Sequence, residues 1–151
     1  MEKKRIKDWD AAAFPVPIRD VMAGQRVFDS SCSDAARVYY VESGLYVKEA
    51  PAGSLAHEKK MGEVFFRHHL GPEVVLYLSE GKDYLVTRKV PGQDLCHHLD
   101  KPELLCGQMA EKLLLLHSLP AEDVPLCPGL SFYREGIMGE GQGFEKYVLM
   151  E

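Results

Sequence analysis

The sequence predicts an α+β fold, in which an antiparallel sheet is interrupted by one helix and followed by a longer one. Short apolar segments rich in β-branched and aromatic residues alternate with turn residues, as strands of hairpins do. Between two groups of these segments lies a stretch with an approximate helical stripe of apolar residues, and a leucine-rich helical stretch comes later. No internal repeat or low-complexity segment interrupts this order. One sheet with helices packed on it accounts for the pattern.

Five segments are expected as strands. Before them, Trp9 and Phe14 are expected to pack a short and partly helical N-terminal segment against the sheet. Glu42-Ser43-Gly44 supplies the turn of the first hairpin. The expected strands are residues 25–28, 38–41, 45–47, 74–78 and 84–87.

Two helices complete the prediction. Ser54 is expected to cap the first one, which runs to about Leu70 and is stopped by Gly71-Pro72. The second runs from Pro102 to His117 and carries leucines on more than one side. A helix of this kind requires burial on several sides, and the chain offers few elements that could bury it.

Composition excludes several classes of protein. The 151 residues are long enough for one domain with a core, and 46% hydrophobic and 27% charged residues are typical of a soluble globular protein. The net charge of -5 argues against nucleic acid as the main partner. No run of apolar residues has membrane-spanning or signal-peptide character, so no membrane partner is expected. The four scattered cysteines indicate reduced thiols in the cytoplasm, and the adjacent histidine pairs lack ligand spacing for a metal.

Lys48 is the first candidate functional residue. It ends the second strand of the first hairpin and lies on the same side as Tyr46, because side chains alternate along a strand. Glu58 follows in the predicted helix. Kinases use an ammonium paired with a helix carboxylate to hold nucleotide phosphates. A lone lysine at a strand end is ordinarily a solvated surface charge, so the order of the surrounding elements must decide between these interpretations.

That order resembles the small lobe of a kinase-like fold, and its motifs resemble the aminoglycoside phosphotransferases. The similarity is greatest to the enzymes that phosphorylate the 3′-hydroxyl of kanamycin-type antibiotics, and it covers roughly residues 20 to 128. The motifs are Ala36-Arg37-Val38-Tyr39, Leu45-Tyr46-Val47-Lys48, His57-Glu58-Lys59, Leu85-Val86-Thr87 before Val90-Pro91-Gly92, and Leu115-Leu116-His117-Ser118-Leu119-Pro120 before Val124-Pro125-Leu126-Cys127-Pro128.

The resemblance implies a division of the chain. Residues 1–90 would form a kinase-like nucleotide-binding lobe, with a five-stranded antiparallel sheet and one helix. Residues 91–128 would hold the hinge and the first helical part of an incomplete large lobe. Residues 129–151, where glycine is frequent, form a poorly specified tail.

The resemblance also implies how ATP would be held. Lys48 would reach the α- and β-phosphates and be held by an ion pair with Glu58. Glu63 is a rival partner, but it lies about 140° around the helix from Glu58, so both carboxylates cannot face the lysine. We therefore expect Glu58 to form the pair.

Two further segments are expected at the nucleotide. The loop from Ser31 to Arg37, with Ser33 at its centre, would cover the phosphates with hydroxyls and backbone N–H groups in place of a glycine-rich pattern. The segment from Arg88 to Val90 would be the hinge, where backbone groups pair with the adenine edge.

The catalytic residues of the family are missing from this sequence. The family places a base and the magnesium ligands in a His-Gly-Asp-x-x-x-x-Asn loop and a later Asp, and no Asp follows Asp123 here. His98-Leu99-Asp100 has a similar outline, but it precedes the long helix, and Leu105 stands at the Asn position. We interpret it as a helix-entry turn with Asp100 near the N-cap. No catalytic residue and no metal ligand are therefore assigned, although the family requires magnesium.

The sequence thus favours an ATP-dependent phosphotransferase lobe that would act on an aminoglycoside only with a large lobe supplied. One alternative is an inactive nucleotide-binding remnant, truncated or shifted in reading frame near residue 129. This alternative predicts a His-Gly-Asp loop in another frame of the downstream DNA. Another alternative keeps the fold and changes the acceptor to choline, homoserine or a sugar.

Overall fold

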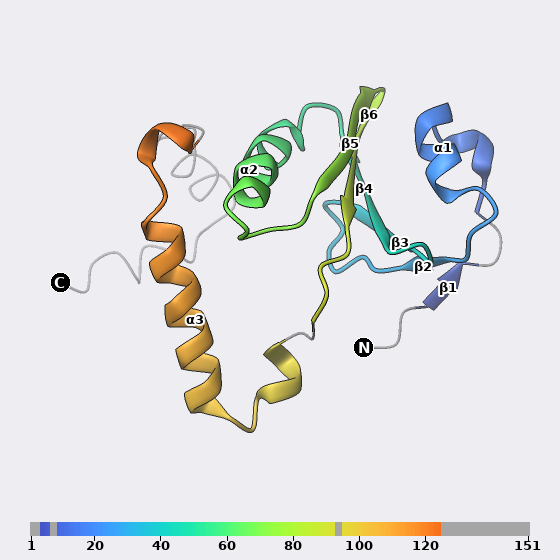
Figure 1. Cartoon of the computed structure of the whole chain (residues 1–151). Helices are drawn as coiled ribbons and strands as arrows, with labels where there is room; N and C mark the ends of the chain where they lie inside the picture. The colour runs from blue at the N-terminus through green and yellow to red at the C-terminus, as the bar shows by residue number, and fades with distance from the viewer. Residues whose placement is uncertain (1–3, 7–8, 93–94, 125–151) are drawn as a thin grey trace, which may run out of the picture.

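The computed structural model describes residues 4–6, 9–92 and 95–124, and its centre is one antiparallel sheet (Figure 1). The sheet has six strands in the order β1-β2-β3-β4-β6-β5. All five predicted strands are present, and the predicted α+β class is confirmed. The strands are β1 (Lys4–Ile6), β2 (Val27–Asp29), β3 (Arg37–Val41), β4 (Leu45–Pro51), β5 (Val74–Glu80) and β6 (Lys82–Arg88).

The sequence predicted five strands, but the sheet has a sixth, β1, which pairs with β2 at the edge of the sheet. This strand has three residues, two of them basic, so it shows neither the β-branched composition nor the alternation that identifies a strand from sequence. The proposed boundary near residue 90 stays a prediction, and the tail at 129–151 lies outside the described residues.

Two helices cover opposite faces of the sheet, α1 (Val16–Met22) on one side and α2 (Ala56–Arg67) on the other (Figure 1). The core beneath α1 includes the expected packing of Trp9 and Phe14, whose rings meet edge to face at 5.8 Å. The buried residues of this core are Phe14, Ile18, Met22, Val27, Tyr39, Val41, Val47, Tyr84 and Val86. Short 3-10 turns occur at η1 (Ala11–Ala13), η2 (Leu95–His98) and η3 (Ala121–Asp123).

The core beneath α2 is smaller and is centred on Ala50, Leu55 and Leu85. The prediction that Ser54 caps α2 is wrong. Leu55 is the N-cap residue, and the Ser54 hydroxyl donates instead to the carbonyl of Pro51 at 2.6 Å. The N–H of Leu55 donates to the carboxylate of Asp83 in β6. The hydrogen-bond acceptor at the start of this helix is therefore a residue that is distant in the sequence.

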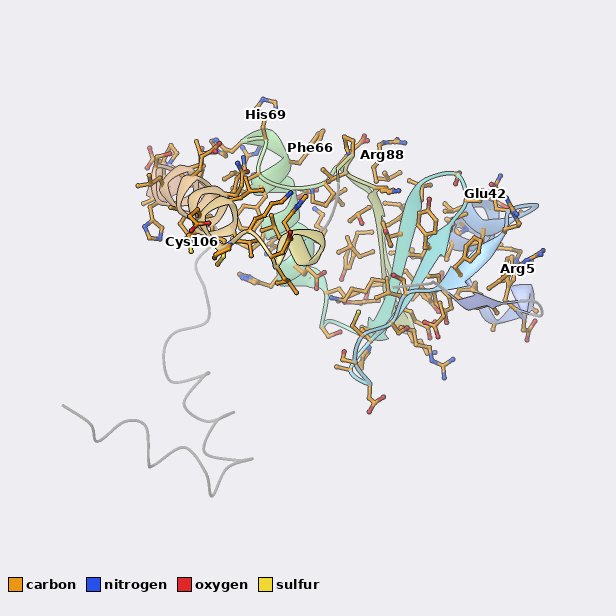
Figure 2. The ribbon with its side chains drawn as sticks, turned by 90° about the horizontal axis from the view of Figure 1, so that it is seen from below. Arg5, Glu42, Phe66, His69, Arg88 and Cys106 are labelled. Carbon is orange, nitrogen blue, oxygen red and sulfur yellow. The ribbon has the colours of Figure 1, made fainter. Side chains whose placement is uncertain are left out.

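The long helix α3 (Pro102–His117) has the predicted bounds and follows η2, which confirms the helix-entry turn before it. None of its residues is buried. Figure 2 shows α3, marked by Cys106, at the opposite end of the molecule from Arg5 of β1. Among the described residues, no helix has both the length and the apolar character needed to cross a membrane.

Candidate nucleotide-binding site

Lys48 and Glu58 form an ion pair in which Lys48 Nζ donates to Glu58 Oε2 at 2.6 Å. Strand alternation turns Val47 into the core beneath α1 and therefore directs Lys48 to the face that carries α2. Glu58 lies in the first turn of α2. Glu63 pairs instead with Lys59, four residues earlier, at 2.8 Å. The structure thus brings Lys48 together with the carboxylate that the sequence favoured.

This pair is accessible to a ligand. The Lys48 side chain is 31% exposed and that of Glu58 is 47% exposed. Exposed ion pairs contribute about 0–1 kcal/mol to stability, so the pair does little to hold the fold together. Glu58 orients the ammonium of Lys48, and the remaining N–H donors of that ammonium can bind an anion such as a phosphate.

A row of aromatic rings continues this face of the sheet beyond Lys48. Tyr46 lies two residues before Lys48 in β4, and its ring centroid is 5.0 Å from that of Tyr40 in β3. Tyr40 in turn lies 6.0 Å from Phe28 in β2, and Lys89 Nζ stands 5.8 Å from the centroid of Tyr40. Partly exposed aromatic faces can stack on a planar base. Only the side shared by Tyr46 and Lys48 was apparent from sequence, because the row crosses three strands.

The loop expected to cover the phosphates, residues 31–37, is held in shape by hydrogen bonds of Ser31 to the strands on either side. Ser31 Oγ accepts from the N–H of Val38 at 3.0 Å, and the Ser31 N–H donates to Asp29 Oδ1 at 2.9 Å. A bridge between Ser33 and Ala36 tightens its tip, where Ser33 is exposed. The hydroxyl of Ser31 therefore orders the loop, while that of Ser33 faces solvent.

Arg37 is not brought to Lys48. It shares its face of β3 with buried Tyr39, which belongs to the core beneath α1, whereas Lys48 faces α2. Its hydrogen bond with Tyr39 and the nearby charge of Glu49 raise the pKa of Arg37. The buried Glu49 also accepts from the Tyr39 hydroxyl at 3.1 Å and pairs with Lys82.

The expected hinge is held against the sheet by its backbone. The N–H of Lys89 donates to the carbonyl of Gly44 at 2.8 Å, so the segment adjoins the hairpin turn that precedes Tyr46 and Lys48. Arg88 Nε donates to Glu73 Oε2 at 2.6 Å, which directs this side chain to the start of β5. The Val90 side chain is 55% exposed.

Asp83 of β6 is a polar residue of this region that sequence reasoning missed. It is fully buried, and its Oδ2 accepts from the N–H of Leu55 at 2.9 Å and from the Tyr77 hydroxyl at 3.0 Å. Its Oδ1 accepts from Ser79 Oγ at 2.7 Å. Burial alone would raise the pKa of Asp83, but these bonds and one from the Gly53 backbone more than offset it and lower the pKa.

A hollow of the described surface lies elsewhere. It measures about 700 Å³, lies between α2, the start of β5 and η3, and includes neither Lys48 nor Glu58. Near it, His68 Nε2 lies 3.0 Å from Asp123 Oδ2 and links the end of α2 to η3. Its lining mixes acidic, basic and apolar side chains without a buried charge. Within the described residues, no group of three or more His, Cys, Asp or Glu side chains could hold a metal ion.

No protein-family model matches the chain, but a curated protein is similar to it. The chain is 31% identical over 118 residues to a probable aminoglycoside 3'-phosphotransferase of Lactococcus lactis subsp. lactis. The match covers 75% of this chain and 45% of the relative, so the chain spans less than half the length of that protein. This match confirms the resemblance to the aminoglycoside phosphotransferases inferred from the sequence, over the part of the relative that the chain covers.

Proposed function

We propose that this chain is the nucleotide-binding lobe of a phosphotransferase of the aminoglycoside 3'-phosphotransferase type, and that Lys48 binds the phosphates of ATP. The observation that carries the proposal is the Lys48–Glu58 pair, at 2.6 Å and open to solvent, on a sheet face lined by aromatic rings. The name of the Lactococcus relative supports the reaction class. Since ATP is abundant in the cytoplasm, we propose that the chain works there.

The geometry fits an adenine nucleotide in two respects. The ammonium of Lys48 offers donors to phosphate oxygens, while Glu58 fixes its direction. Tyr46 lies on the same side of β4, next to the hairpin turn that adjoins Lys89 of the expected hinge. We propose that the base lies toward Tyr46 and the hinge, with the phosphates toward Lys48. Exposed Ser33 of the loop can then donate to a phosphate, whereas Arg37 faces the other core.

Transfer of the phosphate requires more than this lobe supplies. The 151 residues contain no His-Gly-Asp motif, and among the described residues no group of three or more His, Cys, Asp or Glu side chains could hold a metal ion. Magnesium and a base that orients the acceptor hydroxyl contribute much of the rate of phosphoryl transfer. We propose that an aminoglycoside acceptor, and with it antibiotic resistance, depends on a large lobe that packs on α3. The exposed leucines of that helix support such a partner.

The test is a binding measurement on the whole chain. By titration calorimetry, Lys48→Ala should weaken ATP binding by about tenfold, ~1.4 kcal/mol, because the phosphates lose their cation. The affinity for adenosine, which has no phosphate, should stay unchanged. Lys60→Ala, at an exposed lysine of α2, is the matched control and should leave both affinities unchanged.

Two results would contradict the proposal. ATP binding that is indifferent to Lys48→Ala would remove the phosphate role of this lysine. Kanamycin-dependent ATP turnover by this chain alone would show that the 151 residues already contain a catalytic apparatus.

A further inference from the structure

We infer that Asp83 is a positioning residue for the Lys48–Glu58 pair, because it fixes the start of α2 against the sheet so that Glu58 stands opposite Lys48. The inference deepens the proposed function and rests on it for its link to ATP. Its structural part concerns the pair alone and can be tested without nucleotide.

The carboxylate of Asp83 joins three elements at one point. It belongs to β6, accepts from the hydroxyls of Tyr77 and Ser79 in β5, and accepts from the N–H of Leu55, the N-cap residue of α2. Glu58 follows three residues after Leu55, so the same turn of chain that Asp83 holds also carries the carboxylate facing Lys48. A negative charge at this helix end also interacts favourably with the helix dipole.

The Leu55 side chain also holds the start of α2, because it packs with Ala50 and Leu85 in the smaller core, but such apolar packing is non-directional. The N-cap residue provides no side-chain cap, and the buried residue within the helix is Val64, two turns further on. The Lys48–Glu58 pair itself is too exposed to hold a helix in place. The neighbouring position on β4 is Ala50, which pairs with Asp83 across the sheet and lies two residues after Lys48. Asp83 therefore ties the helix to the sheet close to the lysine.

An amide cannot replace this carboxylate. Every group that contacts Asp83 through the three hydrogen bonds above is a donor, with Leu55 and Tyr77 on one oxygen and Ser79 on the other. The NH₂ group of Asn would face the donors on one side, either Leu55 and Tyr77 or Ser79. Those donors would then be left unpaired in a buried site. We expect Asp83→Asn to release the first turn of α2 while the sheet remains folded.

The direct test measures the ion pair by zero-length carbodiimide cross-linking and peptide mass spectrometry. Two pairs report in one experiment: Lys48–Glu58 joins strand to helix, while Lys59–Glu63 lies within α2. Their side chains have nearly equal exposure, 31% and 47% against 32% and 47%. Asp83→Asn should lower the yield of the first product several-fold relative to the second.

Two further variants separate positioning from general loss of stability. Val86→Ala removes part of a fully buried side chain from the same strand, but on the face covered by α1. It should destabilise the chain and leave the ratio of the two products unchanged. Ser79→Ala removes a single donor to Asp83 and should lower the ratio less than Asp83→Asn, which keeps the test possible if Asp83→Asn does not fold.

Nucleotide binding then tests the link to function. Asp83→Asn should weaken the binding of ATP but not that of adenosine, and it should have no further effect in a Lys48→Ala background, because it acts through that lysine. A merely structural role would instead give additive losses for both ligands.

The outcomes distinguish the two proposals. An unchanged product ratio in folded Asp83→Asn overturns the positioning role alone. Absence of the Lys48–Glu58 product in the wild-type chain, with Lys59–Glu63 product present, overturns both. If Asp83→Asn lowers the ratio but Lys48→Ala leaves ATP binding intact, Asp83 positions the pair and the proposed function fails.

Discussion

At the scale of single residues, the buried carboxylate of Asp83 makes the fold sensitive to acid. Its hydrogen bonds lower its pKa below the ordinary value of 3.8, in spite of burial. A carboxyl whose pKa is depressed by folding stabilises the protein at pH above its unfolded pKa. That contribution is lost as the pH falls through the folded pKa. The fold should therefore lose stability on acidification below about pH 4.

Urea unfolding at a series of pH values checks this expectation. Asp83→Asn should be the less stable protein at neutral pH, and its stability should fall less steeply on acidification than that of the wild type, so that the two curves converge. Asp20→Asn, at an exposed position of α1, should follow the wild-type curve. Parallel curves for wild type and Asp83→Asn would show that another group causes the acid sensitivity.

Some residues of the candidate site could be predicted from the sequence and others could not, depending on whether a motif or a local pattern marks them. The pairing of Lys48 with Glu58 was predicted from the order of elements and motifs that resembles a kinase-like fold, and helix geometry then favoured Glu58 over Glu63. Asp83 contacts Leu55 across 28 residues, and no local pattern in sequence reveals this contact. Arg37 was expected at the phosphates as the last residue of the loop from Ser31, and the period of two in β3 places it on the same face as Tyr39, opposite the face of Lys48.

At the scale of elements, the end of α2 carries a strained residue. His69 has φ of 58°, in the left-handed region, and donates its N–H to the carbonyl of Phe66. The N–H of Leu70 reaches the carbonyl of Phe65 at 2.8 Å, which completes a Schellman ending. Glycine is the residue that adopts this conformation without steric cost.

His69→Gly should therefore stabilise the chain by up to about 1 kcal/mol. The measurement is urea unfolding, and the matched control is His57→Gly, the same substitution within the helical part of α2. That control should destabilise the chain by about 0.3–0.5 kcal/mol, because glycine has a lower helix propensity than histidine. Equal effects of the two substitutions would show that the backbone at residue 69 is not strained.

The elements themselves were largely predictable because their local signals were strong. The bounds of α3 agree with the prediction, since Pro102 opens it and a run of helix-forming residues continues to His117. β4 and β5 each run beyond the predicted residues, because pairing in the sheet extends strands past their apolar part. The cap at Ser54 failed because a carboxylate from another element takes that role, and local propensity does not encode such a contact.

At the scale of the whole molecule, the sheet packs with α1 and α2, and α3 lies to one side with none of its residues buried (Figure 1). Among the described side chains, the hydrogen bond of His68 with Asp123 links the segment after α3 to the end of α2. The exposed apolar residues of α3 lie on several sides of the helix, as the sequence suggested. They are Leu104, Met109, Leu113, Leu114, Leu115 and Leu116.

Such a surface should make the chain self-associate, because contiguous apolar area in water favours any contact that covers it. In sedimentation velocity, the chain should form larger species as its concentration rises. Leu113→Lys combined with Leu114→Lys should move this association to about tenfold higher concentration, a change of ~1.4 kcal/mol. These side chains are 50% and 71% exposed, so the substitutions should leave the unfolding midpoint nearly unchanged.

Val16→Lys is the matched control for this prediction, because Val16 is 59% exposed but lies on α1, away from the leucines of α3. It adds one charge to the surface without removing apolar area from α3, so association should persist. If both variants suppress association equally, net charge and not the surface of α3 governs it. A chain that stays monomeric at every concentration would show that α3 is covered in solution, and the proposed packing of a large lobe on this helix would then lose its support.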